Sequence, residues 1–247
     1  MNTIYERAAL VADAAQRMVK HVYSPDTAGK ITEARLEFQK KSPKLATLEE
    51  AIRRSGLTDG MTISFHHHFR GGDKVVNMVV DKLAQMGFRN LHLAASSLSD
   101  VHSPLIGHIR NGVISRISTS GLRGELAQCI SHGLMDEPVV FRSHGGRGSA
   151  IASGDLHIDV AFLGTSSSDP LGNACGYSRS PNARSICGSL GYALPDARYA
   201  DKVVVITDDL VPYPNTPNSI SEHDVDFVVE VDSVGDSSKI ASGAIRD

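Results

Sequence analysis

Five short segments of the sequence have residue types that could bind an anion. These segments are His66–Gly72, Ser96–Asp100, Thr119–Gly124, Arg142–Gly148 and Gly164–Asp169. All are rich in glycine or serine, and the first, third and fourth also contain arginine or histidine. Backbone N–H groups at the start of a helix attract anions, and arginine adds bidentate partners for carboxylates and phosphates. One such loop often serves only to reverse the chain, but several together predict a polyanionic ligand.

The run of three histidines, His66, His67 and His68, raises the question of a metal site. Neighbours on an extended segment point to opposite faces, so these three cannot all bind one ion. No H-E-x-x-H motif or cysteine pair accompanies them, and we predict no metal site. Hydrogen bonding to a bound carboxylate and a satisfied core imidazole remain equal interpretations for these residues. We rank His144, between Ser143 and two glycines, first among the histidines for substrate contact.

Signatures of several other chemistries are missing. No G-x-S-x-G motif follows a predicted strand, no G-x-x-x-x-G-K-[ST] loop is present, and the first strand lacks G-x-G-x-x-G. These observations disfavour a nucleophilic serine, ATP hydrolysis and a nicotinamide cofactor. Cys175 and Cys187 lie in glycine-rich loops without an adjacent base, which disfavours a reactive thiol.

The elements that must position these segments alternate between strand and helix patterns. Short apolar runs of strand type occupy residues 61–65, 91–95, 113–118, 139–141, 158–163, 203–206 and 227–231. Helical spacing of apolar residues occupies 45–55, 74–86, 105–111 and 121–133, and Asp73 is a candidate N-cap. This alternation predicts a doubly wound α/β fold, a mostly parallel sheet with helices on both faces. In such sheets ligands bind beyond the carboxyl ends of the strands, where the five segments would lie.

Composition limits the domain organisation and the partners. The 247 residues carry a net charge of −3, so nothing favours a nucleic acid partner. Residues 1–45 read as an N-terminal helix and a polar connecting arm, which we assign to packing, and residues 46–247 as the α/β domain. Three cysteines without C-x-x-C, no signal-peptide core and no apolar run of about 18 residues predict a cytoplasmic protein without a membrane partner.

Several motifs resemble those of CoA-transferases. The stretch 59–65 followed by Gly71-Gly72-Asp73 is similar to their first strand and glycine loop, and 159–163 followed by 169–173 is similar to their second signature. More specifically, FHHHFRGGDKVVNMVVDKLAQMGFRNLHLAASSLSD, STSGLRG, SHGGRG and DVAFLG resemble the citrate lyase alpha subunit family from about Leu48 onward. The resemblance implies a CoA-transferase-like α/β domain that is the first half of a longer two-half subunit. In this sequence His66–Arg70 lie between the strand and the glycine loop, whereas the loop follows the strand directly in the wider family. We therefore do not apply the oxyanion geometry of the wider family to this chain.

The resemblance also implies an activity, citrate CoA-transferase within an ATP-independent citrate lyase complex. An acetyl group on a carrier-protein thioester would be exchanged for citrate through a mixed anhydride, releasing acetate. No tightly bound cofactor is implied, because the acyl thioester of CoA or of a CoA-derived prosthetic group comes with the carrier protein. Implied partners are this acyl carrier protein, the citryl lyase beta subunit and further copies of the chain. Two alternatives remain open: an inactive half that docks the carrier protein, and a sugar-phosphate isomerase-like enzyme.

The catalytic residues are not identified by these patterns, but a set of substrate-binding candidates is. They are His66, His67, Arg70, Gly71, Gly72, Ser120, Arg123, Ser143, His144, Gly145, Gly146, Arg147 and Asn173. We expect Gly71 and Gly72 to approach the ligand through their backbone. The segment from Arg142 to Arg147 is the expected principal carboxylate site, with Arg147 opening a helix. The alternative for Arg147 is a surface ion pair with Asp155 or Asp159.

Overall fold

The computed structural model describes residues 43–66, 69–180, 187–236 and 238–240 of the 247-residue chain. The predicted N-terminal helix and nearly all of the connecting arm, as well as His67 and His68, lie outside these residues. The last residues assigned to the arm do lie within them. Leu45 forms a parallel bridge to Val228, so residues 43–45 pack on the α/β body. None of the described helices is long and apolar enough to cross a membrane.

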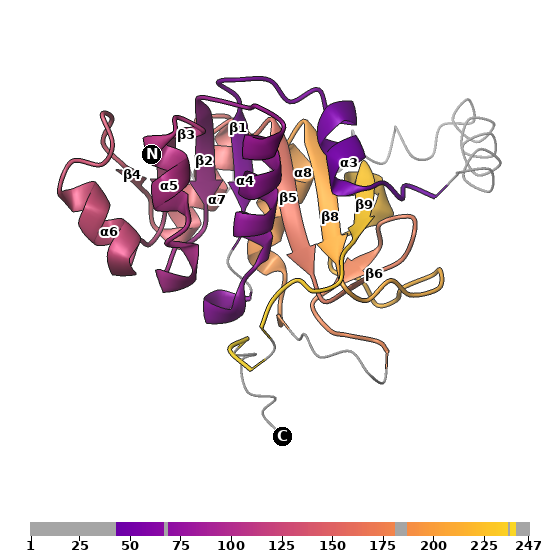
Figure 1. Ribbon diagram of the computed structural model, residues 1–247. Coiled ribbons are helices and arrows are strands. Elements are labelled where there is room, and N and C mark those ends of the chain that lie inside the picture. The colour runs from indigo at the N-terminus through magenta and orange to yellow at the C-terminus, as the bar shows by residue number, and fades with distance from the viewer. Residues whose placement is uncertain (1–42, 67–68, 181–186, 237, 241–247) are drawn as a thin grey trace, which may run out of the picture. The chain divides into compact units, whose positions relative to one another are not determined.

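Seven parallel strands form the central sheet, as the sequence predicted (Figure 1). They are β1 (Thr62–Phe65), β2 (Leu91–Ala95), β3 (Ile114–Thr119), β4 (Val140–Phe141), β5 (Val160–Thr165), β8 (Lys202–Thr207) and β9 (Phe227–Glu230). Their spatial order is β4-β3-β2-β1-β5-β8-β9. The chain therefore builds one side of the sheet from β1 to β4 and the other side from β5 to β9. The strand order reverses between β1 and β5, where ligands bind in doubly wound folds.

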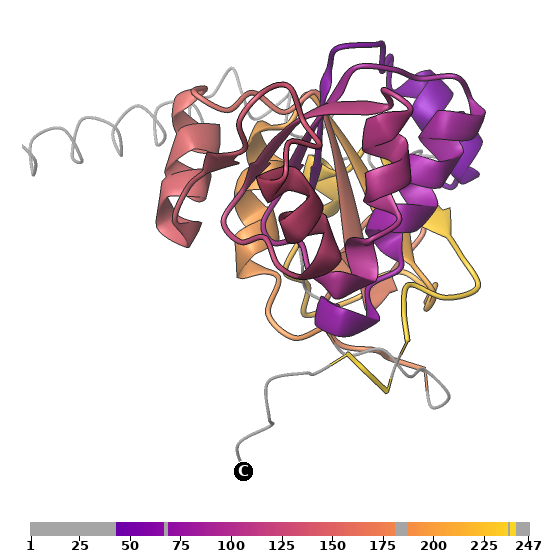
Figure 2. The same ribbon diagram turned by 60° about the vertical axis from the view of Figure 1, so that its left-hand side comes forward.

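Helices cover both faces of this sheet. One face carries α3 (Leu48–Arg54), α4 (Val75–Gln85) and α5 (Leu105–Arg110), with α6 (Gly124–Ser131) beside α5; the other carries α7 (His144–Ser153) and α8 (Leu194–Tyr199) (Figures 1 and 2). The helical spacing read from the sequence explains how α4 packs. Its buried stripe consists of Val75, Val76, Val79, Val80 and Leu83. The doubly wound α/β fold is thereby confirmed.

Smaller elements lie among the connections. A two-stranded antiparallel ribbon follows β5, formed by β6 (Ser167–Ser168) and β7 (Ala174–Cys175). Single 3-10 turns occupy Arg70–Gly72, Asp100–His102, Gly191–Ala193 and Glu222–Asp224. Helix α6 starts three residues later than predicted. The reason is that Gly121 O accepts a hydrogen bond from Leu98 N at 2.8 Å and Arg123 N donates to Leu98 O at 3.1 Å, which keeps this segment extended.

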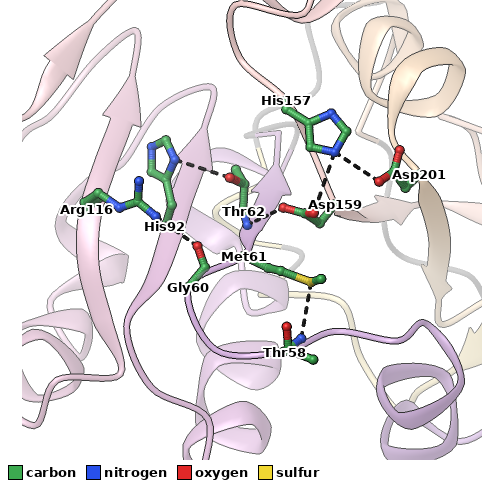
Figure 3. Close-up of polar contacts among 9 residues, drawn as sticks. All are labelled: Thr58, Gly60, Met61, Thr62, His92, Arg116, His157, Asp159 and Asp201. Carbon is green, nitrogen blue, oxygen red and sulfur yellow. Dashed lines mark hydrogen bonds and ion pairs between the residues drawn. The ribbon is translucent and has the colours of Figure 1, made fainter.

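Polar side chains form hydrogen bonds between neighbouring strands at the amino-terminal edge of the sheet (Figure 3). Asp159 Oδ2 accepts from Thr62 N at 2.7 Å, and Arg116 Nη2 donates to Gly60 O at 2.9 Å. His92 lies between Thr62 and Ser118, with its Nε2 2.9 Å from Ser118 Oγ. Burial, then the nearby charges of two arginines, lower the pKa of His92 to about 4. These side chains connect neighbouring strands and the loops that precede them. The candidate site lies at the opposite, carboxyl-terminal edge of the sheet.

Candidate functional site

A cavity of about 1070 Å³ lies beyond the carboxyl ends of the strands. Its lining comes from the loops after β1, β2 and β3, from the start of α7, from the chain between β7 and α8, and from the segment after β9. The lining residues are Arg70, Gly71, Ser96, Ser97, Ser99, Asp100, Val101, Arg123, His144, Tyr177, Cys187, Gly188, Ser189, Tyr192 and Lys239. We call this cavity the pocket. It stands at the edge of the sheet where the sequence predicted a ligand.

The loop after β1 holds Arg70 in an unusual backbone conformation. Its φ is +51°, in the left-handed region that costs a side-chain-bearing residue roughly 1–2 kcal/mol. The preceding Phe69 is buried, and its ring fills the space beside Gly164 of β5, where a Cβ would meet the ring at 2.6 Å. This packing fixes the start of the turn. Arg70 itself remains exposed and lines the pocket.

The loops after β2 and β3 are joined through their backbones and bring Asp100 against Gly124. Gly124, the first residue of α6, has a φ of +72°, and a Cβ there would lie 1.6 Å from Asp100 Oδ1. Glycine is therefore required at this position both for its conformation and for the close approach of Asp100. The Asp100 carboxylate therefore lies against the first residue of α6.

The start of α7 contributes His144. Ser143 is the N-cap, and its Oγ accepts from Gly146 N at 3.0 Å. The His144 ring contacts Tyr192 edge to face, with centroids 4.8 Å apart, so two distant segments meet in this part of the wall. The positive end of the α7 dipole favours an anion near His144.

Positive charge predominates among the ionisable groups of the pocket. Arg70, Arg123 and Lys239 oppose the single carboxylate of Asp100. Lys239 Nζ lies 3.2 Å from Asp236, whereas, within the described part of the chain, no carboxylate lies within ion-pair distance of either arginine. Two guanidinium groups without a carboxylate partner suit a ligand that carries several carboxylates.

Cys187 is the thiol of the pocket wall. It is 8% exposed, and burial raises its pKa to about 11. The thiol is therefore protonated near neutral pH, which is the opposite of what a nucleophilic cysteine needs.

Four of the predicted binding residues line the pocket. These are Arg70, Gly71, Arg123 and His144. Ser143, Gly145 and Gly146 lie in or next to the first turn of α7 but outside the lining, and the amide of Gly146 is bound by the N-cap. His66 is buried at the end of β1, and Ser120 Oγ is buried with no hydrogen-bond partner among the described residues. His67 lies outside the described residues.

Arg147 does not occupy the predicted position. Its Nη1 and Nη2 donate to the two carboxylate oxygens of Asp196 at 2.8 and 2.7 Å, and the side chain is only 3% exposed. Helix α7 begins at His144 rather than at Arg147, so Arg147 falls on the buried stripe that includes Ala150 and Ile151. Arg147 thus binds the internal carboxylate of Asp196 in place of a ligand carboxylate. The alternative partners, Asp155 and Asp159, do not pair with it.

Gly72 and Asn173 also have internal roles in place of the predicted contact with a ligand. A Cβ on Gly72 would lie 2.4 Å from Asp236 O and 2.7 Å from Ile240, so the chain's own backbone uses the space. The Asn173 side chain donates to Asp169 at 2.8 Å and to Glu222 at 2.9 Å inside a buried polar cluster. Neither residue lines the pocket.

Other lining residues were not predicted as site residues. The serines after β2 and Asp100 lie in one of the five segments and could have been chosen from their position after a strand. Tyr177, Cys187, Tyr192 and Lys239 carried no such signal, because they reach the pocket from distant parts of the chain.

One group of side chains in the described residues could hold a metal ion. Donor atoms of His157, Asp159 and Asp201 lie within 4.8 Å of one another at the amino-terminal edge of the sheet (Figure 3), and none of the three residues lines the pocket. His157 Nε2 lies 3.0 Å from Asp201 and 3.6 Å from Asp159. His157 and Asp201 are mostly exposed, and these ion pairs account for the arrangement.

Comparison with known proteins identifies similar chains. The family model described as citrate lyase, alpha subunit, matches residues 42–247. The citrate lyase alpha chain of Escherichia coli K12 is 61% identical over 201 residues, covering 81% of this chain and 39% of that protein. The corresponding chain of Klebsiella pneumoniae is 61% identical over 211 residues, covering 85% and 41%. The chain thus spans about two fifths of the length of these relatives.

Solved structures give a consistent result. A putative citrate lyase alpha subunit of Streptococcus mutans, crystallised in complex with citrate, superimposes with a TM-score of 0.78 at 56% identity, covering 83% of this chain and 40% of that one. Glutaconate coenzyme A-transferase of Acidaminococcus fermentans, at 14% identity, has a TM-score of 0.56 over 76% of this chain and 75% of that one, which shows a shared fold. These similarities give no support to the sugar-phosphate isomerase or docking-module alternatives.

Proposed function

The chain belongs to the citrate lyase alpha subunit family, and we propose that its pocket binds citrate during a citrate CoA-transferase reaction. The observation that carries this proposal is the pair of arginines, Arg70 and Arg123, that line the pocket without a carboxylate partner among the described residues. Citrate has three carboxylates, and charge-assisted bonds to arginine would bind two of them. The S. mutans relative was crystallised with citrate, which supports this choice of ligand.

The proposed reaction exchanges one acyl group for another in two steps. A citrate carboxylate attacks the carbonyl of an acetyl thioester and expels the thiolate, which gives an acetyl–citryl mixed anhydride. The thiolate then attacks the citryl carbonyl of the anhydride and expels acetate, which leaves a citryl thioester. Each step forms one bond and breaks one bond, and no enzyme thioester is needed.

The pocket would assist these steps by charge and by position. The attacking carboxylate and the leaving acetate are anions, and cations near them reduce the repulsion between reacting groups. Holding both acyl groups side by side removes the entropy cost of their encounter. The volume of about 1070 Å³ is at the upper end of small-molecule sites, which leaves space for a thioester arm beside citrate.

The thioester is a substrate in this proposal, and no tightly bound cofactor is required. It would be the thioester of CoA or of a CoA-derived prosthetic group on an acyl carrier protein. A citryl lyase beta subunit would cleave the product, and further copies of the alpha chain would complete an ATP-independent complex in the cytoplasm. Cys129, Cys175 and Cys187 are free thiols, which fits a reducing compartment.

Titration calorimetry with citrate tests the proposal directly. We expect the 247-residue chain to bind citrate, and Arg123→Gln to weaken binding by about tenfold or more, because one charge-assisted bond is lost. Lys82→Gln, in α4 and outside the pocket lining, is the matched control for loss of one positive charge and should bind as the parent does. Equal affinity of the Arg123 variant and the parent would refute the assignment of the pocket.

Turnover is tested separately. Acetyl-CoA and citrate are incubated with this chain and with a version extended to the full length of the relatives, and acetate and citryl-CoA are measured by mass spectrometry. Exchange by the extended version supports the proposed activity. No exchange with either version, although both bind citrate, would contradict the transferase assignment.

A further inference from the structure

Two side chains inside the protein link the loop after β1 to the loop after β2. Asp73 is 2% exposed, His102 is 0% exposed, and His102 Nε2 lies 3.1 Å from Asp73 Oδ2. Neither side chain lines the pocket. The loops that contain them, however, supply Arg70 and Gly71 on one side and Ser99 and Asp100 on the other.

The surrounding hydrogen bonds determine which ring nitrogen of His102 carries a proton. The backbone N–H of Ser99 donates to His102 Nδ1 at 3.0 Å, so this nitrogen is an acceptor. The proton therefore lies on Nε2, which donates to Asp73 Oδ2. The other oxygen, Asp73 Oδ1, accepts from Val75 N at 2.8 Å at the start of α4. A continuous chain of hydrogen bonds, part-buried at Ser99 and buried beyond it, thus connects Ser99 in the pocket wall to α4.

Backbone contacts tie the rest of the wall into two groups. Leu98 N donates to Gly121 O at 2.8 Å, which joins the loops after β2 and β3. Asp236 N donates to Gly72 O at 2.8 Å, which joins the loop after β1 to the segment that carries Lys239. The Asp73–His102 pair links these two groups, and Asn77 of α4 adds a second contact by donating to the carbonyl of Val101 at 2.8 Å.

We infer that Asp73 and His102 are positioning residues that set the spacing between Arg70 and the opposite wall of the pocket. The pair touches no ligand and acts through the two loops. The inference rests on the proposed function for the identity of the ligand, citrate. It predicts that loss of the hydrogen bond between the two side chains weakens citrate binding although every lining residue is retained.

The chemistry of the pair provides a selective way to break and restore this bond. In Asp73→Asn, the new amide NH2 group faces the N–H of His102 Nε2 or, after an amide flip, the N–H of Val75. Moving the ring proton to Nδ1 would oppose the N–H of Ser99 instead, so either tautomer loses one hydrogen bond. A glutamine at position 102 reaches Asp73 and can turn its amide to present nitrogen to aspartate or oxygen to asparagine. Every arrangement of Asp73→Asn therefore breaks the chain of hydrogen bonds from Ser99 to α4 at one link. The bond between positions 73 and 102 is kept in His102→Gln, and the double variant keeps this bond and the bond to Val75.

Citrate affinity by calorimetry and hydrogen exchange of the two loops form the experiment. We expect Asp73→Asn to bind citrate about tenfold more weakly and to exchange faster over residues 96–103, because a buried hydrogen bond is lost. His102→Gln and the double variant should stay within about threefold of the parent. Val205→Ala, in the buried part of β8, is the control for lost stability alone and should bind as the parent does.

Each outcome separates the inference from the proposed function. Unchanged affinity in Asp73→Asn, or an equal loss in Val205→Ala, would overturn the positioning role. If the parent itself binds no citrate, the proposed ligand is wrong, and hydrogen exchange then decides: faster exchange that the double variant reverses supports the inference, and unchanged exchange overturns it. Should Asp73→Asn not fold, His102→Asn replaces it, since asparagine offers Ser99 an acceptor but is too short to reach Asp73.

Discussion

Arg70 is the residue at which function and backbone strain can be separated most clearly. Among the described residues only Arg70 and Asn90 have a positive φ without being glycine, at +51° and +60°. Glycine adopts this conformation without steric cost, and Arg70→Gly should therefore relieve strain. The strain is roughly 1–2 kcal/mol, and the greater freedom of glycine in the unfolded chain offsets roughly 0.5–1 kcal/mol of it.

The net effect on the free energy of unfolding is then between about zero and 1.5 kcal/mol in favour of the variant. Citrate binding should change in the opposite direction. One charge-assisted hydrogen bond contributes roughly 1.5–3 kcal/mol, so the dissociation constant should rise about ten- to a hundredfold. A variant that is at least as stable as its parent but binds more weakly cannot be explained by damage to the fold.

Urea denaturation and citrate calorimetry on the same samples measure the two quantities. Asn90→Gly is the matched control, because it relieves the steric cost of the other positive φ, just before β2 at the amino-terminal edge of the sheet, away from the pocket. It should leave citrate affinity unchanged. The reasoning is refuted if Arg70→Gly binds citrate as tightly as the parent, or if the glycine variant loses more than about 1 kcal/mol of stability.

Arg147→Met should lower the free energy of unfolding by about 3–5 kcal/mol, because the buried carboxylate of Asp196 loses its partner. Citrate affinity should be unchanged at temperatures where the variant is folded, and a loss of affinity there would show that Arg147 contributes to the binding site. Because the pKa of His92 is lowered in the folded protein, the unfolded chain takes up a proton at a higher pH than the folded chain does. The contribution of neutral His92 to the free energy of unfolding is therefore complete above pH 6.5 and is lost as the pH falls toward 4. His92→Gln, which can still bond to Ser118, should reduce the slope of stability against pH in that interval, and an identical slope would contradict this assignment. Gly124→Ala should destabilise the protein by more than about 1 kcal/mol and weaken citrate binding, since its Cβ would displace Asp100; a stable variant with normal binding would show that the loop adapts.

The sequence alone determined the sheet and most of its helices. Apolar runs of strand type predicted each strand of the sheet to within a few residues, and the stripe from Val75 to Leu83 predicted α4. These signals are local, since the period of buried residues along a strand or helix is set by backbone geometry. The same pattern predicted a site at the carboxyl edge, where the pocket lies, and included Arg70, Arg123 and His144, which line it.

The register of one helix was enough to change the role of a residue. Arg147 has the type and loop context of an anion ligand, but α7 starts three residues before it. At 3.6 residues per turn this shift turns the side chain from the helix end to the sheet, where it meets Asp196, 49 positions away in the chain. Nothing near Arg147 in the sequence indicates that partner.

Only the tertiary structure decided which distant segments complete the pocket. Lys239 follows β9, and Tyr192 precedes α8, yet both line the same cavity as Arg70. Gly72 illustrates the same limit, because its lack of a side chain is required by Asp236, more than 160 positions later. Periodicity reports which face of an element is buried, whereas the meeting of loops depends on strand order and on the packing of the whole sheet, and neither is a local property of the chain.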